Sequence, residues 1–309
     1  MAARDPDAAG PFSGRVTFDD VDARAEAADL GDEPATMRER FATLVMGDAA
    51  DEQSGTGAPE EVGGVGGLVF RPGGAASGTA RVVWFHGGGY VFGSPETHAR
   101  AAAALAERVG AAVFVPRYRL APEHPWPAQR EDALAVVRAL QDAGGRVALV
   151  GDSAGGHLAL VAALALARGD RPVDALVLFS PNTDRTGRSD TRGPNTPRDA
   201  MNADEDDRDL ARLAFGDRPD SDPEVSPLLD DLSLLPPTHV EVGDQEVLLD
   251  DARLLARRGA EAGADVALHV EPGASHMWQL WTPWLPEADA SIRRAAAFLR
   301  QRLGAGADG

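Results

Sequence analysis

The sequence predicts an α/β fold in which helices cover both faces of a mainly parallel sheet. Short runs of apolar and β-branched residues alternate with longer alanine-rich stretches over most of residues 68–303. The runs are apolar throughout, which is typical of strands buried on both faces. With 309 residues and 43% hydrophobic content, the chain can bury one large core, so a single globular unit is expected.

The strands and helices can be placed from these runs in chain order. Strands are expected at residues 68–70, 81–85, 111–115, 146–150, 175–180, 238–242 and 266–270. Helices are expected at residues 97–109, 128–142, 155–168, 250–262 and 287–303. Because helices separate most of the strands, parallel pairing is the expected arrangement.

The N-terminal segment, residues 1–65, lies outside this alternation. It is acidic and contains one predicted amphipathic helix, marked by four apolar residues at helical spacing behind Pro34: Met37, Phe41, Leu44 and Val45. We expect this segment to form part of a lid over the core.

Residues 181–235 form a second interruption, which is polar and rich in Asp and Pro, with one helix expected near 204–215. Between strands at the carboxyl edge of a sheet, such an insertion is placed to cover a crevice. We therefore expect a lid made of this insertion and the N-terminal segment, on a core of residues 66–180 and 236–309.

Composition and charge exclude several classes of protein. A formal net charge of -19 disfavours binding to nucleic acid and stable association with anionic membranes, because both surfaces are negatively charged and would be repelled. The absence of cysteine excludes disulfides, thiolate metal sites and cysteine nucleophiles. The N-terminus lacks the basic and apolar regions of a signal peptide, and the longest near-apolar run, residues 158–167, is too short to span a bilayer. A cytoplasmic protein is expected.

A serine between two glycines is the strongest chemical signal in the chain. Residues 151–155 read G-D-S-A-G between a predicted strand and a predicted helix. The glycines allow a sharp turn, so that Ser153 projects while the N–H of Ala154 points toward the group that the serine attacks. The pattern alone occurs by chance in Gly-rich chains, but this strand–turn–helix setting predicts a nucleophile.

Three consecutive glycines, Gly87, Gly88 and Gly89, follow the strand predicted at 81–85. Their N–H groups have no side chains in the way, which suits them to hold an oxyanion together with the N–H of Ala154. A phosphate-binding loop would need a lysine and a helix that begins at once, and neither is present.

A serine nucleophile needs a base within reach, and seven histidines compete for that role. Five of them fit structural positions in predicted strands, helices or loops: His98, His124, His157, His239 and His269. His276 follows the last predicted strand, at the carboxyl end of the sheet where the crevice forms, and comes after the serine as the motif order requires. It is the predicted base.

The acid that orients the base is expected between the serine and the histidine, on a loop after a strand. Glu241 falls inside a predicted strand, whereas Asp250 and Asp251 begin a helix whose N-terminus favours negative charge. Asp244 and Glu246 remain as candidates. Alternation along the chain does not separate them, because they are two residues apart.

Together the motifs resemble the hormone-sensitive-lipase-like α/β-hydrolases, known as bacterial esterase family IV. The resemblance rests on HGGGY (86–90), YRLAPEHPWPA (118–128), GDSAGG (151–156), DPEVSPL (222–228), LPP (235–237) and SHMWQL (275–280). It implies an α/β-hydrolase fold with a helical lid, and a serine carboxylesterase that needs no metal or cofactor. The family's acid usually opens a D-P-L-x-D motif. Here residues 246–250 read EVLLD, which favours Glu246 over Asp244 if glutamate replaces aspartate.

The resemblance leaves the substrate open. It implies short-acyl esters, but the HMWQL…LPEA ending is also similar to that of monoterpene-lactone hydrolases, so a lactone is an alternative. A compact pocket is expected from three aromatic residues: Tyr90, Phe92 and Trp278. A non-catalytic receptor of the same fold is a further alternative, although such proteins lose the base and His276 is present. A homodimer through the last strand and helix is implied by resemblance alone.

Overall fold

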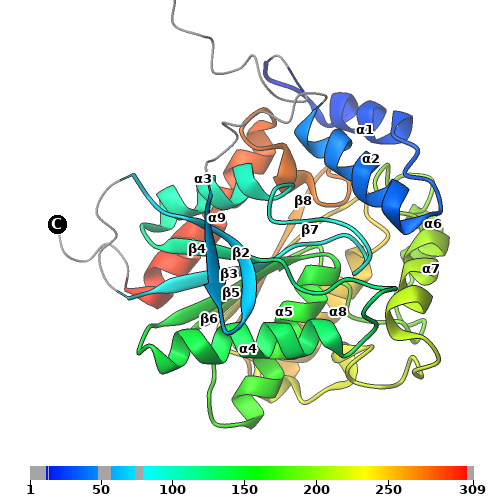
Figure 1. The fold of residues 1–309 in the computed structure, drawn as a ribbon. Helices are drawn as coiled ribbons and strands as arrows, with labels where there is room; N and C mark the ends of the chain where they lie inside the picture. Colours follow the sequence, from blue (N-terminus) through cyan, green and yellow to red (C-terminus); the bar gives the residue numbers. More distant parts are fainter. Residues whose placement is uncertain (1–11, 13, 48–56, 74–78, 305–309) are drawn as a thin grey trace, which may run out of the picture.

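A twisted eight-stranded sheet with helices on both faces forms the centre of the structure, a computed structural model that describes residues 12, 14–47, 57–73 and 79–304 (Figure 1). The strand order is β1-β2-β4-β3-β5-β6-β7-β8. The β1–β2 and β2–β4 pairs are antiparallel, and all the other neighbours are parallel. The predicted α/β-hydrolase fold is confirmed.

The predicted strands are all present, with small differences at their ends. The strands are β1 (Ala58–Val62), β2 (Val65–Phe70), β3 (Arg81–Phe85), β4 (Ala112–Pro116), β5 (Val147–Asp152), β6 (Ala175–Phe179), β7 (Thr238–Gly243) and β8 (Val266–Glu271). Every residue of β4, β5 and β6 is buried, which explains why their sequences are apolar without alternation, apart from the buried Asp152 at the end of β5.

The first strand, β1, was not expected from the sequence. It pairs with β2 as a hairpin in which Val62 lies opposite Val65 across Gly63 and Gly64. Both glycines have positive φ, the conformation that tight two-residue hairpin turns require. Only Val62 is buried in β1, so no apolar run marks the strand. The sheet therefore begins at residue 58, inside the N-terminal segment that was expected to belong to the lid.

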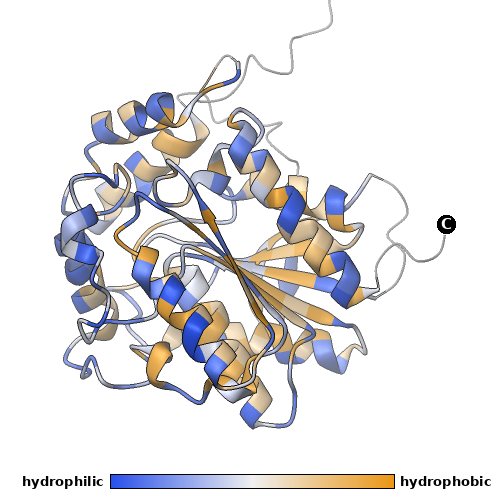
Figure 2. Cartoon of the chain, turned by 180° about the vertical axis from the view of Figure 1, so that it is seen from behind, coloured by the Kyte–Doolittle hydropathy of each residue, from blue (hydrophilic) through white to orange (hydrophobic). Residues whose placement is uncertain are grey.

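Five helices cover the sheet: α3 (Ala99–Val109), α4 (Ala128–Asp142), α5 (Ala154–Arg168), α8 (Leu249–Glu261) and α9 (Pro286–Leu303). Helices α3 and α9 pack together on one face, and α4, α5 and α8 lie on the other (Figure 1). Figure 2 shows the apolar strands between helices whose outer surfaces are hydrophilic. Each face of the sheet thus has its own apolar cluster.

The remaining helices are gathered at one end of the sheet (Figure 1). They are α1 (Phe18–Ala27), α2 (Pro34–Met46), α6 (Arg192–Asn195) and α7 (Asp204–Phe215), with short 3-10 turns η1 (Pro227–Leu229), η2 (Leu232–Leu234) and η3 (Trp278–Trp281) elsewhere. One N-terminal helix was expected, and the described residues contain two. The sequence did not predict α1 because that helix buries only Val21 and Ala25, too few residues for a periodic apolar pattern. Residues 1–11, 13 and 48–56 of that segment lie outside the described residues.

Buried ion pairs fasten the insertion to the core. Arg192 of α6 donates to Asp207 of α7 at 2.7 Å and to Asp251 of α8 at 3.0 Å. Asp207 also pairs with Arg185 at 2.9 Å. Although burial opposes ionisation, these two arginines hold the pKa of Asp207 well below its usual range. The insertion is therefore anchored to the core by a network of buried charges.

No helix in the described ranges is both long enough and apolar enough to cross a membrane.

Candidate active site

Ser153 occupies a strained turn between β5 and α5. Its φ is +53°, which side-chain-bearing residues rarely adopt, and it is 8% exposed. A Cβ on Gly151 would collide with the carbonyl group of Gly155, and one on Gly155 would collide with the carbonyl oxygen of Phe85. Glycine is therefore required on both sides of the serine, since the start of α5 lies directly against the strands.

The structure brings the three predicted side chains into one hydrogen-bonded series. Nε2 of His276 lies 2.8 Å from Oγ of Ser153, and Nδ1 of His276 lies 2.7 Å from Oε2 of Glu246. Ser153 follows β5, Glu246 follows β7 and His276 follows β8, so the carboxyl ends of three strands bring the side chains together. Asp244 lies elsewhere: its carboxylate accepts from the side chain of Gln245 and from the N–H of Gly273.

Glu246 is completely buried and is held by two further donors. Its Oε1 accepts from the hydroxyl of Ser180 at 2.7 Å and from the N–H of Gly243 at 2.6 Å. A carboxylate can only accept, so its other oxygen, Oε2, selects the His276 tautomer that carries a proton on Nδ1. Nε2 is then free to accept the hydroxyl proton of Ser153.

The electrostatic surroundings of His276 favour its charged form. Burial alone would lower the pKa of the imidazole. The hydrogen bond and charge of Glu246, together with the charges of Asp199 and Asp152, outweigh burial and raise the pKa above its ordinary value of 6.5. The side chain is therefore a stronger base than free histidine.

Gly87, Gly88 and Gly89 differ in what their N–H groups can do. The N–H of Gly87 donates to Oδ2 of Asp152 at 2.9 Å, so this group is already engaged, and the expectation that it holds an oxyanion is corrected. Gly88 and Gly89 line the same cavity as Ser153. Ala154 is the first residue of α5, where N–H groups have no partner within the helix.

Asp152 acts as the buried support of that glycine loop. It accepts from Nε1 of Trp84 at 2.8 Å and contacts Nε2 of His98 at 3.1 Å. Burial would raise the pKa of this carboxyl, but the interactions with His98 and Trp84 have a larger opposite effect. The pKa is therefore below its ordinary value, and the carboxyl is ionised. His98 thus has the structural role expected of it.

A cavity of about 710 Å³ lies above Ser153 and His276, between the N-terminal helices and α7. Most of its wall is apolar, including Leu30, Met37, Leu44, Phe92, Met201, Leu210, Leu213 and Met277. This is the space into which a substrate would enter.

Two of the three aromatic residues expected in the pocket lie outside it. Phe92 lines the cavity, but Tyr90 and Trp278 do not. The hydroxyl of Tyr90 lies 2.5 Å from Nδ1 of His157, and its ring packs against Phe215 at the end of α7. Trp278 is fully buried. Large rings bury the most apolar area when they are enclosed on all sides, which accounts for their place in the core.

Asp199 is a site residue that the sequence did not reveal. It is 6% exposed, lines the cavity and accepts N–H groups from both His276 and Val247. Burial raises the pKa of this carboxyl to about 6, with Glu246 adding to the shift and His276 opposing it. In the sequence it is one aspartate among many in a polar insertion, and no motif distinguishes it.

Asp199, Glu246 and His276 are also the one group of potential metal ligands found among the described residues, with ligand atoms within 4.8 Å of one another. Both nitrogens of His276 are engaged, by Glu246 and by Ser153. A metal ion would have to break these hydrogen bonds, so the closeness of the three side chains reflects their mutual network.

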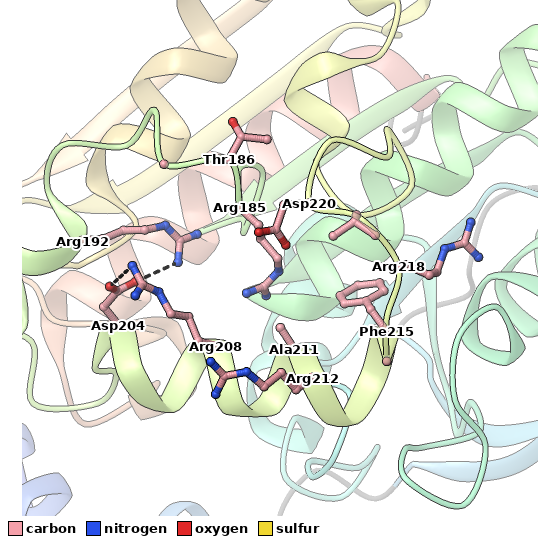
Figure 3. Close-up of a pocket in the computed structure, with 13 residues that line it drawn as sticks. Arg185, Thr186, Arg192, Asp204, Arg208, Ala211, Arg212, Phe215, Arg218 and Asp220 are labelled. Atoms are coloured by element: carbon pink, nitrogen blue, oxygen red, sulfur yellow. Dashed lines mark ion pairs between the residues drawn. The ribbon is translucent and has the colours of Figure 1, made fainter.

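A second cavity, of about 400 Å³, lies on the other side of α7 and is polar (Figure 3). Its wall contains Arg185, Arg192, Arg208, Arg212 and Arg218. Each arginine pairs with an acidic side chain, as Arg208 does with Asp204 at 2.8 Å. Three of these carboxylates, those of Asp207, Asp209 and Asp222, lie outside the cavity wall. Neither Ser153 nor His276 reaches this cavity.

Comparison with known proteins identifies the family of the chain. A family described as the alpha/beta hydrolase fold matches residues 82–280. An acetyl-hydrolase of Streptomyces hygroscopicus is 40% identical over 232 residues, which cover 73% of this chain and 77% of that protein. An esterase of Acinetobacter venetianus is 34% identical over 228 residues, covering 72% and 75%. A solved esterase of the bacterial hormone-sensitive lipase family has a TM-score of 0.87 at 36% identity, covering 93% of this chain and 98% of its own. The chain therefore belongs to the α/β-hydrolase family, in its hormone-sensitive-lipase group.

Proposed function

We propose that this chain is a serine carboxylesterase that hydrolyses short-acyl esters through an acyl-enzyme intermediate on Ser153. Its relatives are named as esterases and an acetyl-hydrolase, which makes it a carboxylic ester hydrolase. The observation that carries the mechanism is the series of hydrogen bonds from Ser153 through His276 to Glu246 beside an apolar cavity.

Acylation begins when Nε2 of His276 takes the hydroxyl proton as Oγ of Ser153 attacks the ester carbonyl carbon. The carbonyl oxygen becomes an oxyanion, which accepts hydrogen bonds from the N–H groups of Gly88, Gly89 and Ala154. When the bond to the alcohol breaks, His276 gives its proton to the departing oxygen. The acyl group remains on Ser153.

Water repeats the sequence to release the acid. His276 takes a proton from the water as its oxygen attacks the acyl carbon, and returns that proton to Oγ of Ser153. Glu246 accepts the hydrogen bond from Nδ1 of His276 and stabilises the imidazolium in both halves of the reaction. None of these steps requires a cofactor.

The cavity has room for a small-molecule ester. Its 710 Å³ must hold both the acyl chain and the alcohol. Apolar side chains of α2, α7 and the loop before α7 form much of its wall, and aspartates such as Asp206 and Asp209 line the rest. Short-acyl esters and compact lactones both match this size, so both belong in the substrate panel. A non-catalytic receptor of the same fold would not need the hydrogen bond between His276 and Ser153.

The homodimer suggested by the family resemblance also remains a proposal. β8 is at the edge of the sheet, and none of its six residues is fully buried. Such an edge can pair with a second copy. Light scattering of the purified chain tests this.

Substitution of the nucleophile is the direct test of function. Ser153→Ala should abolish hydrolysis of p-nitrophenyl butyrate and of lactones while the circular-dichroism spectrum remains that of the wild type. A variant with full activity would refute the assignment.

A further inference from the structure

Asp199 belongs to the insertion, but its carboxylate ends between the loops that carry the predicted acid and base. Oδ1 accepts from the N–H of His276 at 3.2 Å and from the N–H of Met201 at 3.2 Å. Oδ2 accepts from the N–H of Val247, next to Glu246, at 3.1 Å. One carboxylate thus fixes the backbone at both positions.

Neighbouring residues of the insertion fasten the same loop. The side-chain amide of Asn195 donates to the carbonyl oxygen of Glu246 at 2.8 Å, and the hydroxyl of Thr191 donates to that of Val247 at 3.0 Å. Arg198 donates to the side chain of Gln245 at 2.9 Å. Residues 191–199 therefore form a continuous attachment to the loop after β7, and Asp199 extends it to the loop after β8.

The charge of Asp199 acts on the same histidine. Three acidic groups influence His276: Glu246 from the loop after β7, Asp199 from the insertion, and Asp152 at the end of β5. Of these, Glu246 hydrogen-bonds the ring and Asp152 supports the glycine loop, whereas Asp199 bonds the histidine's backbone. An ionised Asp199 favours the imidazolium that forms when Ser153 loses its proton.

We propose that Asp199 is a positioning residue for ester hydrolysis, which aligns the loops of Glu246 and His276 and adds a further negative charge beside the imidazolium. The insertion then does more than cover the cavity, since it supplies part of the framework that orients the base. This inference rests on the proposed role of His276 as the base.

The alternative is a carboxylate that only stabilises the fold. In that case its loss would lower the melting temperature, and the remaining activity would keep its pH profile. A residue that acts through His276 changes the pKa that governs the reaction, so the pH profile separates the two roles.

The test uses Asp199→Asn and Asp199→Glu, each checked by circular dichroism and melting temperature. For p-nitrophenyl butyrate, we expect Asp199→Asn to lower kcat by about 10- to 100-fold, because the loops lose alignment, with little change in KM. The acidic limb of its kcat/KM profile should move to lower pH by about one unit, because the imidazolium has lost a nearby negative charge. Asp199→Glu keeps the charge, so its acidic limb should stay near that of the wild type.

Asp184→Asn is the matched control. Asp184 is a fully buried aspartate of the same insertion, but its carboxylate bonds to Thr186 and to the N–H of Arg188. Its substitution should leave the acidic limb unchanged.

An Asp199→Asn profile that coincides with that of the wild type would overturn the inference, as would failure of both Asp199 variants to fold while Asp184→Asn folds. Ser153→Ala keeps the two proposals apart. If that variant is active, the proposed function fails, whatever Asp199 does.

Discussion

Each carboxylate oxygen of Glu246 and Asp152 accepts hydrogen bonds from particular donors. These bonds determine which donors and acceptors in the site remain available to a substrate. Oε1 of Glu246 is occupied by Ser180 and Gly243, which leaves Oε2 for His276. The N–H of Gly87 is occupied by Asp152, so Gly88 and Gly89, which line the cavity, are the proposed donors to an oxyanion. At the scale of residues, the site is defined as much by groups that are already satisfied as by groups that are free.

The assignment of the acid can be tested at this scale. Glu246→Gln would place an amide against Nδ1 of His276 and favour the wrong imidazole tautomer, so kcat should fall by about ten-thousand-fold. Asp244→Asn disturbs only bonds to Gln245 and Gly273, and its kcat should stay within about threefold of the wild type. Steady-state assays with p-nitrophenyl butyrate make the comparison. A greater loss in Asp244→Asn would transfer the role to Asp244.

The pH dependence of the wild type follows from His276. The base must be neutral in the free enzyme, and its pKa is raised above 6.5 by Glu246, Asp199 and Asp152 against the effect of burial. Activity is therefore present above the raised pKa and is lost as the pH falls through it. The acidic limb of kcat/KM should have a midpoint above 6.5 in low-salt buffer. A midpoint well below that value would mean that burial dominates.

At the scale of elements, the sequence predicts those helices and strands whose residues are mostly buried. β4, β5 and β6 are recognisable because their residues are apolar without alternation, except Asp152 at the end of β5. Ser153 is recognisable because a strand and a helix frame it. β1 and α1 bury so few side chains that their patterns carry no signal. Asp199 escapes notice for another reason: its importance comes from contacts 48 and 77 residues away in the chain.

The aromatic residues expected in the pocket also show what the sequence alone does not predict. Tyr90 and Phe92 are two positions apart in the chain, and only the second lines the cavity. Which aromatic ring faces a cavity depends on the neighbours that surround it, and for Tyr90 those neighbours include His157 from α5 and Phe215 from α7. Composition and spacing do not contain that information.

The attachment of the insertion leads to a prediction about stability. Arg192→Met would leave the carboxylates of Asp207 and Asp251 buried with fewer partners, and should lower the free energy of unfolding by about 3–5 kcal/mol. Arg208→Met is the matched control from the same cavity wall (Figure 3), since its side chain is 64% exposed and its pair with Asp204 should contribute at most about 1 kcal/mol. Urea unfolding followed by circular dichroism measures both. Equal midpoints for the two variants would contradict the anchoring role.

At the scale of the whole molecule, the excess of acidic side chains governs the response to salt. The formal charge of -19 comes from 49 acidic and 30 basic residues, so repulsion remains after the ion pairs are formed. Salt screens that repulsion and the attractive surface pairs alike, but the uncompensated charge is the larger contribution in a chain of this composition.

We therefore expect the melting temperature at pH 8 to rise by a few degrees between about 10 mM and 500 mM NaCl. Near pH 5, close to the sequence isoelectric point of about 4.7, the net charge is small and screening acts mainly on the attractive pairs. The rise should then disappear or reverse. Differential scanning calorimetry at both pH values provides the comparison, with each scan repeated in sucrose to separate screening from preferential exclusion. An equal rise at pH 5 and pH 8 would show that salt acts through exclusion from the surface, and not through the charge of the protein.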